Sequence, residues 1–116
     1  MSGSDSKIKS CYAQIRSEDH RLYSHELVKR LDSDSVSQRS TALTGLFTIR
    51  DEAIAAHLMK MSNDSSATVR QLAVFYLGEL RAKYAVATIS ERLSDKSQEV
   101  RAAARIAYRK ITGADA

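Results

Sequence analysis

The chain has 116 residues, the length of one domain, which is enough to bury an apolar core without disulfides or a structural metal. Hydrophobic residues make up 43% and charged residues 28% of it, which excludes a wholly disordered or fibrous chain. The formal net charge of +4 permits attraction to nucleic acid, anionic lipid or an acidic protein. The Lys and Arg residues are nevertheless spread along the chain, as on a solvated helical surface.

Features that define several other classes are absent from the sequence. The longest run without Asp, Glu, Lys or Arg is 40–49, about half of what a membrane-spanning helix needs. The amino terminus has no apolar signal core, so we expect a cytoplasmic protein. The single cysteine, Cys11, cannot form an internal disulfide and lies in no zinc-binding spacing. Proline is missing and only four glycines occur, which disfavours a many-stranded sheet and predicts an all-α fold.

The N-terminal region has the weakest pattern. Residues 1–5 are predicted to be a disordered tail. An apolar stripe follows at helical spacing, formed by Ile8, Cys11, Tyr12 and Ile15. We interpret region 6–23 as an N-terminal capping helix.

The rest of this single domain repeats with a period of 31 residues. Segment 69–73 aligns with segment 100–104, and a step back by the same spacing places Arg39 in register with Arg70. A short polar turn containing aspartate and serine precedes each arginine. A fixed period of this length is typical of stacked helical units. The three predicted copies are 24–50, 51–81 and 82–112.

Each copy contains two stretches of helical apolar spacing, separated by the polar turn. In the middle copy, Ile54, Leu58 and Met61 form the first stripe at i, i+4 and i+7. The second stripe runs over 69–80 with the same periodicity. The unit is therefore a helical hairpin, and three copies predict six helices, the last of which ends at Gly113.

The recurring pattern is a polar turn with aspartate, then Val-Arg and Ala, and in the middle copy a Leu-Gly ending. The segments that carry it are 62–64, 69–73, 77–80, 94–95 and 100–104. The pattern resembles a HEAT repeat, specifically the short bacterial-type repeat of phycobilin lyases and related small proteins. The resemblance covers about 24–112, and the first copy departs from it with Gln38-Arg39 in place of Val-Arg. It implies a right-handed α-solenoid whose second helices line one concave side.

The resemblance also implies a role for the repeated charged residues. In the family, the acidic turn residue and the arginine at the start of the second helix form a hydrogen-bonded ladder between neighbouring copies. The residues at these positions are Asp64, Asp95, Arg39, Arg70 and Arg101. The alternative is that the arginines form a row that binds a ligand.

No motif for catalysis, a metal or a phosphate group occurs in the sequence. His20, His25 and His57 have no metal-ligand spacing, and no glycine-flanked nucleophile turn is present. The isolated glycines form neither a phosphate loop nor a dinucleotide fingerprint. We therefore expect a protein that is not an enzyme and has no cofactor or metal.

A candidate recognition surface lies on the side of each second helix away from its strongest apolar line. At 100° per residue, this side grades from apolar and aromatic in the first copy to cationic in the last, where Arg101, Arg105 and Arg109 form a basic line. The candidate partner-binding residues are Ser40, Thr44, Phe47, Gln71, Val74, Phe75, Arg105 and Arg109. For Phe47, Val74 and Phe75, the alternative is packing against the first helices or a neighbouring copy.

Such a surface suits an acidic amphipathic segment of another protein. The main hypothesis is therefore a HEAT-like interaction module, a scaffold or adaptor with no membrane partner. The resemblance to phycobilin lyases leaves a second hypothesis, an accessory role in the attachment or removal of a bilin. The basic line leaves a third, binding of nucleic acid, although Tyr12, Tyr23 and Tyr84 are not interleaved with it as stacking platforms.

Overall fold

The computed structural model describes residues 23–51 and 53–114. The predicted tail at 1–5 lies outside the described residues, and so does the predicted capping helix at 6–23 except for its last residue. A first helix covers 23–30, and five more follow: α2 (Val36–Thr48), α3 (Ile54–Met61), α4 (Ala67–Glu79), α5 (Val86–Arg92) and α6 (Gln98–Thr112). A 3-10 turn, η1 (Lys83–Ala85), precedes α5. The described residues contain no strand, so the all-α prediction is confirmed.

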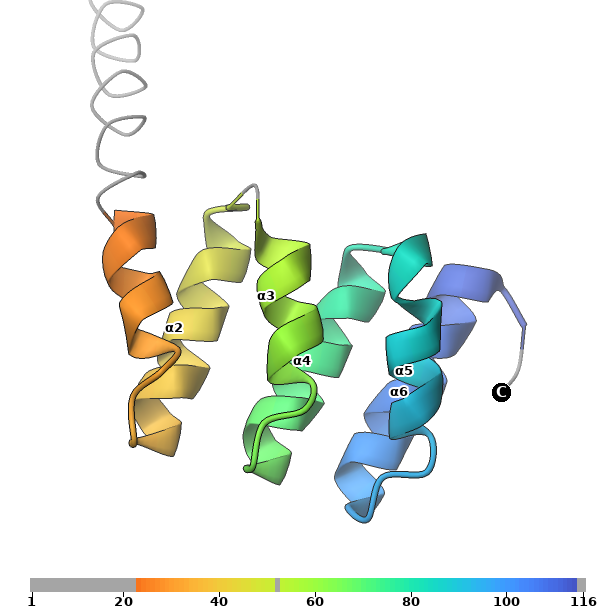
Figure 1. Cartoon of the computed structure of the whole chain (residues 1–116). Coiled ribbons are helices and arrows are strands. Elements are labelled where there is room, and N and C mark those ends of the chain that lie inside the picture. The colour runs from red at the N-terminus through yellow and green to blue at the C-terminus, as the bar shows by residue number, and fades with distance from the viewer. Residues whose placement is uncertain (1–22, 52, 115–116) are drawn as a thin grey trace, which may run out of the picture.

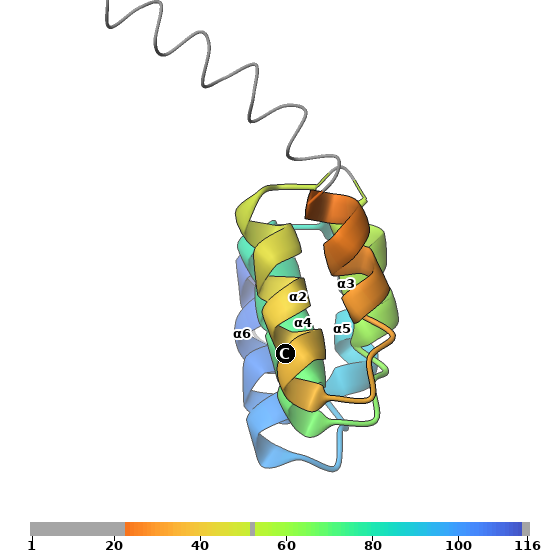
Figure 2. The same cartoon turned by 90° about the vertical axis from the view of Figure 1, so that its left-hand side faces the viewer.

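The helices form three hairpins that stack side by side (Figure 1). The first helices of the hairpins, 23–30, α3 and α5, make one layer. The second helices, α2, α4 and α6, make the other, as the end-on view in Figure 2 shows. This is a small α-solenoid, as predicted.

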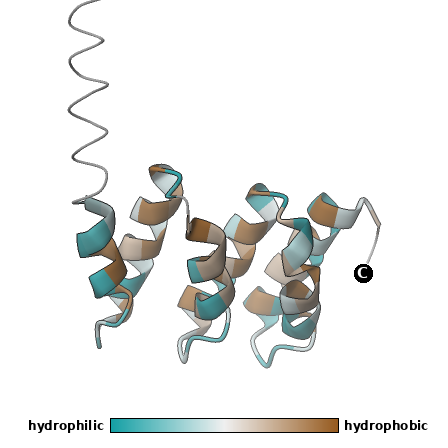
Figure 3. Cartoon of the chain, turned by 45° about the horizontal axis from the view of Figure 1, so that its top comes forward, coloured by the Kyte–Doolittle hydropathy of each residue, from teal (hydrophilic) through white to brown (hydrophobic). Residues whose placement is uncertain are grey.

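The core lies between the two layers and repeats with the sequence period. Ala42, Ala73 and Ala104 stand 31 residues apart, and each is fully buried. Leu46 and Leu77, at the same spacing, are also fully buried. Figure 3 shows apolar segments along the helices and more hydrophilic ones in the turns that connect them. The register read from the sequence is therefore the register of the core.

Two helices end in a conformation that the sequence does not reveal. Arg50 follows α2 and Arg81 follows α4, with φ of 54° and 52°. After α4, the backbone N–H of Arg81 donates to Gly78 O, and that of Ala82 donates to Leu77 O. These two hydrogen bonds define a Schellman motif. A left-handed residue that is not glycine is strained. The predicted stop at Gly113 is confirmed, with φ of 74°.

The second helices of the last two copies approach each other closely at Gly78. A Cβ atom at this position would lie 2.8 Å from both the Cα and the Cβ of Ala107. At Gly45, the corresponding clash at 2.8 Å is with Cδ1 of Leu27, which is the end of a flexible side chain. The two glycines therefore differ in whether the neighbouring group can move away.

We expect Gly78→Ala to lower the free energy of unfolding by about 1–3 kcal/mol, because α4 and α6 must separate to admit the methyl group. Gly45→Ala is the matched control. It should be neutral or stabilising by up to about 1 kcal/mol, because alanine favours the helix and Leu27 can change rotamer. Urea unfolding of both variants measures the difference, and equal midpoints would contradict the close approach.

Ala73→Leu should also destabilise the protein by about 1–3 kcal/mol, because the larger side chain overpacks a fully buried position. Ala56→Leu, on the exposed side of α3, makes the same chemical change without burial. Thermal unfolding compares the two. An unchanged midpoint for Ala73→Leu would show that the helix phase is wrong.

Candidate functional site: a groove beside an arginine–aspartate ladder

A ladder of arginine and aspartate side chains connects neighbouring copies. Arg39 is the fourth residue of α2, and its Nε and Nη2 donate to Oδ1 and Oδ2 of Asp64 at 3.1 and 3.0 Å. Its Nη1 donates to the carbonyl oxygen of Ser33 at 2.8 Å. Because three nitrogens of one planar group are bonded, the guanidinium has a single orientation.

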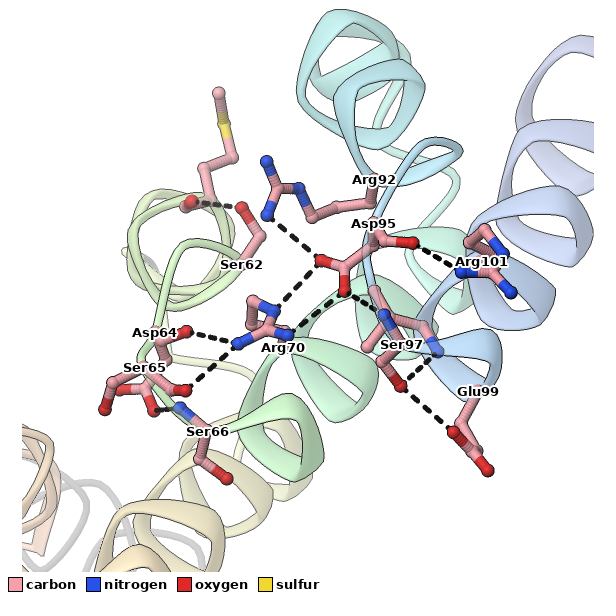
Figure 4. Close-up of polar contacts among 12 residues, drawn as sticks. Ser62, Asp64, Ser65, Ser66, Arg70, Arg92, Asp95, Ser97, Glu99 and Arg101 are labelled. Carbon is pink, nitrogen blue, oxygen red and sulfur yellow. Dashed lines mark hydrogen bonds and ion pairs between the residues drawn. The ribbon is translucent and has the colours of Figure 1, made fainter.

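The same geometry recurs one copy further along (Figure 4). Arg70 is the fourth residue of α4, and its Nε and Nη2 donate to Oδ2 and Oδ1 of Asp95 at 3.0 and 3.1 Å. Its Nη1 donates to the carbonyl oxygens of Asp64 and Ser65 at 2.9 and 3.1 Å. In both pairs the arginine belongs to one copy and the aspartate to the polar turn of the next copy. This is the arrangement that the family resemblance implies.

Asp95 is the more buried of the two carboxylates. Its side chain is 2% exposed, compared with 10% for Asp64. Besides the Arg70 bonds, Asp95 accepts the backbone N–H of Ser97 at 2.9 Å and Nη1 of Arg92 at 3.1 Å. The Arg70 hydrogen bond is the largest influence on the pKa of Asp95, and with the Ser97 amide and both arginine charges it outweighs desolvation and lowers that pKa. The carboxylate therefore stays ionised although it is buried.

Arg101 has the same position in the third copy but different surroundings. It is the fourth residue of α6, and its Nη1 donates to the carbonyl oxygen of Asp95 at 2.7 Å. Arg39 and Arg70 make the equivalent bond to their own turns. Within the described residues, no carboxylate of a following turn meets the Nε and Nη2 of Arg101.

A groove of about 620 Å³ lies on the outer face of the second-helix layer, mainly between α4 and α6. Its apolar surface includes Leu72 and Phe75 of α4 and Ala102, Ala103 and Ile106 of α6. Phe75 and Ile106 remain 45% and 51% exposed. Two large apolar side chains on neighbouring helices therefore face the same open space.

Charged groups stand at the two ends of this groove, because α6 runs along it from Glu99 to Lys110. Lys110 is ion-paired with Glu79, and its Nζ lies 5.6 Å from the centroid of the Phe75 ring. Glu99 accepts a hydrogen bond from the Ser97 hydroxyl at 3.0 Å and makes no ion pair within the described residues. Its own backbone N–H, and then the Ser97 hydroxyl, lower the pKa of Glu99. The groove thus ends in a carboxylate at one side and a neutralised lysine at the other.

The structure places only part of the predicted recognition surface in this groove. Ser40, Gln71 and Phe75 line it. Val74 is fully buried, so its predicted place on the surface is wrong. The reason is that Val74 lies 100° around α4 from Phe75, on the arc that turns toward α6 rather than toward solvent.

In the first copy, the predicted surface is occupied by contacts within the protein. The ring of Phe47 stacks on that of Tyr76 with centroids 4.0 Å apart, and the Arg50 guanidinium lies 4.0 Å from the Phe47 centroid. Thr44 is exposed, and its hydroxyl accepts a hydrogen bond from the Tyr76 hydroxyl at 3.0 Å. Phe47 and Thr44 therefore join α2 to α4 and do not line the groove.

Arg105 and Arg109 are exposed, as expected of surface residues, but they do not line the groove. They stand 31 residues after Val74 and Gly78, which turn toward the following helix. The two arginines are therefore on the side of α6 that faces away from α4. The predicted single surface is in fact two surfaces, an apolar groove and a basic end.

The sequence interpretation missed several groove residues. Leu72 lies in the apolar stripe predicted over 69–80, and Ala103 stands 31 residues after it, yet both are only partly buried and line the groove. Lys110 also lines the groove, and no pattern in the sequence indicates it. The sequence does contain a signal for this side of α4. The polar residues Thr68 and Gln71 lie one helical turn before Leu72 and Phe75, which indicates a side that is not part of the core.

No group of three or more His, Cys, Asp or Glu side chains among the described residues is arranged to hold a metal ion. No helix in that part of the chain is long and apolar enough to cross a membrane. His20 and Cys11 lie outside the described residues.

Stacked hairpins joined by a ladder define this protein as an α-solenoid built from helical repeats. The sequence matches the family described as HEAT repeats over residues 24–109. The chain therefore belongs to the HEAT-repeat family, whose members are commonly protein-interaction modules. No curated protein gives a significant match to the chain.

We expect Asp95→Asn to lower the free energy of unfolding at pH 7 by about 3–5 kcal/mol, because the buried Arg70 loses its charged partner. The pKa of Asp95 is lower in the folded chain than the ordinary value of 3.8. The stability that this group contributes is therefore present above pH 3.8 and lost as the pH falls through the folded pKa.

The stability difference between the parent protein and Asp95→Asn should consequently shrink below pH 3.8. Urea unfolding at a series of pH values measures it. Asp34→Asn, on the exposed part of the first turn, is the control for removal of one carboxylate and should have little effect at any pH. A pH-independent difference for Asp95→Asn would contradict the assigned role of the charge.

Proposed function

We propose that this chain is a non-catalytic protein-interaction module whose groove binds an amphipathic segment of a partner protein. The observation that carries the proposal is the exposure of Phe75 and Ile106 on neighbouring helices of one groove. A contiguous apolar surface of this kind, bordered by polar groups, is typical of an interaction site. Membership of the HEAT-repeat family supports the same function.

The shape of the groove supports an elongated occupant. It follows two neighbouring helices of the second layer and is open to solvent, so a helix or extended segment can lie along it. Aromatic anchors buried at the centre of an interface supply most of its binding energy. Phe75 is therefore the residue on which binding should depend most.

The charges at the ends predict the polar part of the partner. Glu99 is exposed and ionised, and it forms no ion pair within the described residues, although the charge of Arg101 contributes to lowering its pKa. Lys110 is already paired with Glu79. A basic side chain beside the apolar anchor therefore complements the groove better than the acidic one expected from the sequence, because the arginines lie elsewhere.

A random peptide library, selected against the protein, tests this proposal. We expect the selected peptides to carry apolar residues at i, i+3 or i+4 with a basic residue nearby. Phe75→Ala should weaken them by more than about 1 kcal/mol, measured by fluorescence anisotropy. Tyr84→Ala removes an aromatic ring that is 68% exposed in η1, outside the groove, and should have no effect.

Two results would contradict the proposal. Selected peptides that bind equally well to Phe75→Ala would place the contact surface elsewhere. A change in the visible absorbance of an added bilin that is lost in Phe75→Ala would favour the second hypothesis, an accessory role in bilin attachment or removal. Circular dichroism of both variants establishes that the fold is retained.

A further inference from the structure

The basic line on α6 lies at the end of the described stack. Arg101, Arg105 and Arg109 stand 31 residues after Arg70, Val74 and Gly78 of α4. In α4, Arg70 reaches the next turn, Val74 is fully buried and Gly78 touches Ala107. Helix α6 is the last of the second helices in the described stack (Figure 1), so the equivalent face of α6 has no following helix within the described residues. The third copy thus presents cationic side chains on the face with which α4 binds its neighbour.

On this face, the Arg101 side chain keeps one of the contacts that orient Arg39 and Arg70 toward a carboxylate. In Arg39 and Arg70, one nitrogen is fixed by a carbonyl of the preceding turn while Nε and Nη2 hold an aspartate at 3.0–3.1 Å. Arg101 keeps the fixing bond, Nη1 to Asp95 O at 2.7 Å. Its orienting contact is therefore present, although no aspartate of the described residues occupies the other two nitrogens.

We propose that this end of the solenoid binds an acidic segment of another protein. One carboxylate of the segment takes the place on Arg101 that Asp64 has on Arg39 and Asp95 has on Arg70. A second acidic side chain lies near Arg105, which is exposed and makes no ion pair within the described residues. Arg109 adds positive charge but already has an interaction within the chain, so the proposal does not depend on it.

The geometry of the ladder favours this occupant over a second copy of the chain. At the opposite end of the described stack, Ser33 stands at the position of Asp64 and Asp95, and the exposed carboxylates of Asp32 and Asp34 lie on either side of that position rather than at it. The Ser33 hydroxyl accepts the backbone N–H of Ser35 at 3.1 Å, as the aspartates accept those of Ser66 and Ser97 at 2.9 Å. It cannot in addition receive the paired bonds of a guanidinium, which need two carboxylate oxygens.

The surface is separate from the groove. Arg101 and Arg105 do not line the groove, and Phe75 and Ile106 do not belong to the basic line. A substitution can therefore abolish binding at one of the two surfaces and leave binding at the other unchanged.

A short fluorescein-labelled peptide of alternating Asp and Ser is the probe, and the same peptide with Asn in place of Asp is its control. At low ionic strength, the acidic peptide should bind and the Asn peptide should not. Arg101→Lys keeps the charge but removes the planar pair of donors, so we expect binding to weaken by roughly tenfold. Arg105→Gln should weaken binding less and flatten its dependence on salt.

Lys83→Gln is the matched control, because it removes a cation from an exposed position on η1. It should leave binding almost unchanged, and so should Phe75→Ala. In NMR spectra of the protein, the acidic peptide should shift the Nε–Hε signal of Arg101 but not that of Arg70, whose nitrogens are already bonded.

Several outcomes would overturn the proposal. Failure of the acidic peptide to bind would overturn it, and so would binding to Arg101→Lys as tight as to the parent, because the effect would then depend on net charge alone. Self-association in sedimentation experiments that Arg101→Lys abolishes would make a second copy the occupant. Tight binding of duplex DNA at this end, with displacement of the peptide, would make nucleic acid the occupant instead.

Discussion

The bond between an arginine of one copy and the aspartate of the next turn sets the register of the stack. Apolar burial has no preferred direction, so the core leucines and alanines alone would let one hairpin slide along its neighbour. Asp95 is held in its own turn by Arg92 and the Ser97 amide. Its two carboxylate oxygens therefore have a fixed position, and only one placement of the neighbouring copy lets Arg70 donate to both of them. A shift would leave buried charges unpaired, which is more costly than the loss of one apolar contact.

A fixed register gives α4, the middle one of the second helices, four distinct faces. In α4, Ala73 points into the core, Tyr76 meets α2 and Gly78 meets α6. Phe75 is left for the groove. Because successive residues are 100° apart, neighbours in sequence such as Phe75 and Tyr76 serve different faces. Function is therefore assigned to single positions of the helix rather than to its apolar side as a whole.

The fold could be predicted because the period, the polar turns and the core alanines all recur at the same spacing. The groove could be predicted only in part. Val74 and Phe75 are both apolar, and the sequence alone does not show which of them the next copy covers. The left-handed Arg50 and Arg81 could not be foreseen, because the residue that usually marks such a helix end is glycine. Their side chains are held by Phe47 and by the Lys110 carbonyl, contacts that depend on tertiary structure.

The copies differ in sequence, so the two ends of the described stack are not equivalent. A repeat at the end of a stack needs polar groups on its outer face, but many polar residues would satisfy that need. The third copy replaces the buried Val74 with Arg105, which a solvent-facing position explains. It also retains Arg101 with its bond to the Asp95 carbonyl, which solubility does not require. A guanidinium in the orientation that binds aspartate elsewhere in the ladder is what the proposed recognition of a carboxylate requires, whereas the other end of the described stack has Ser33 at the matching position.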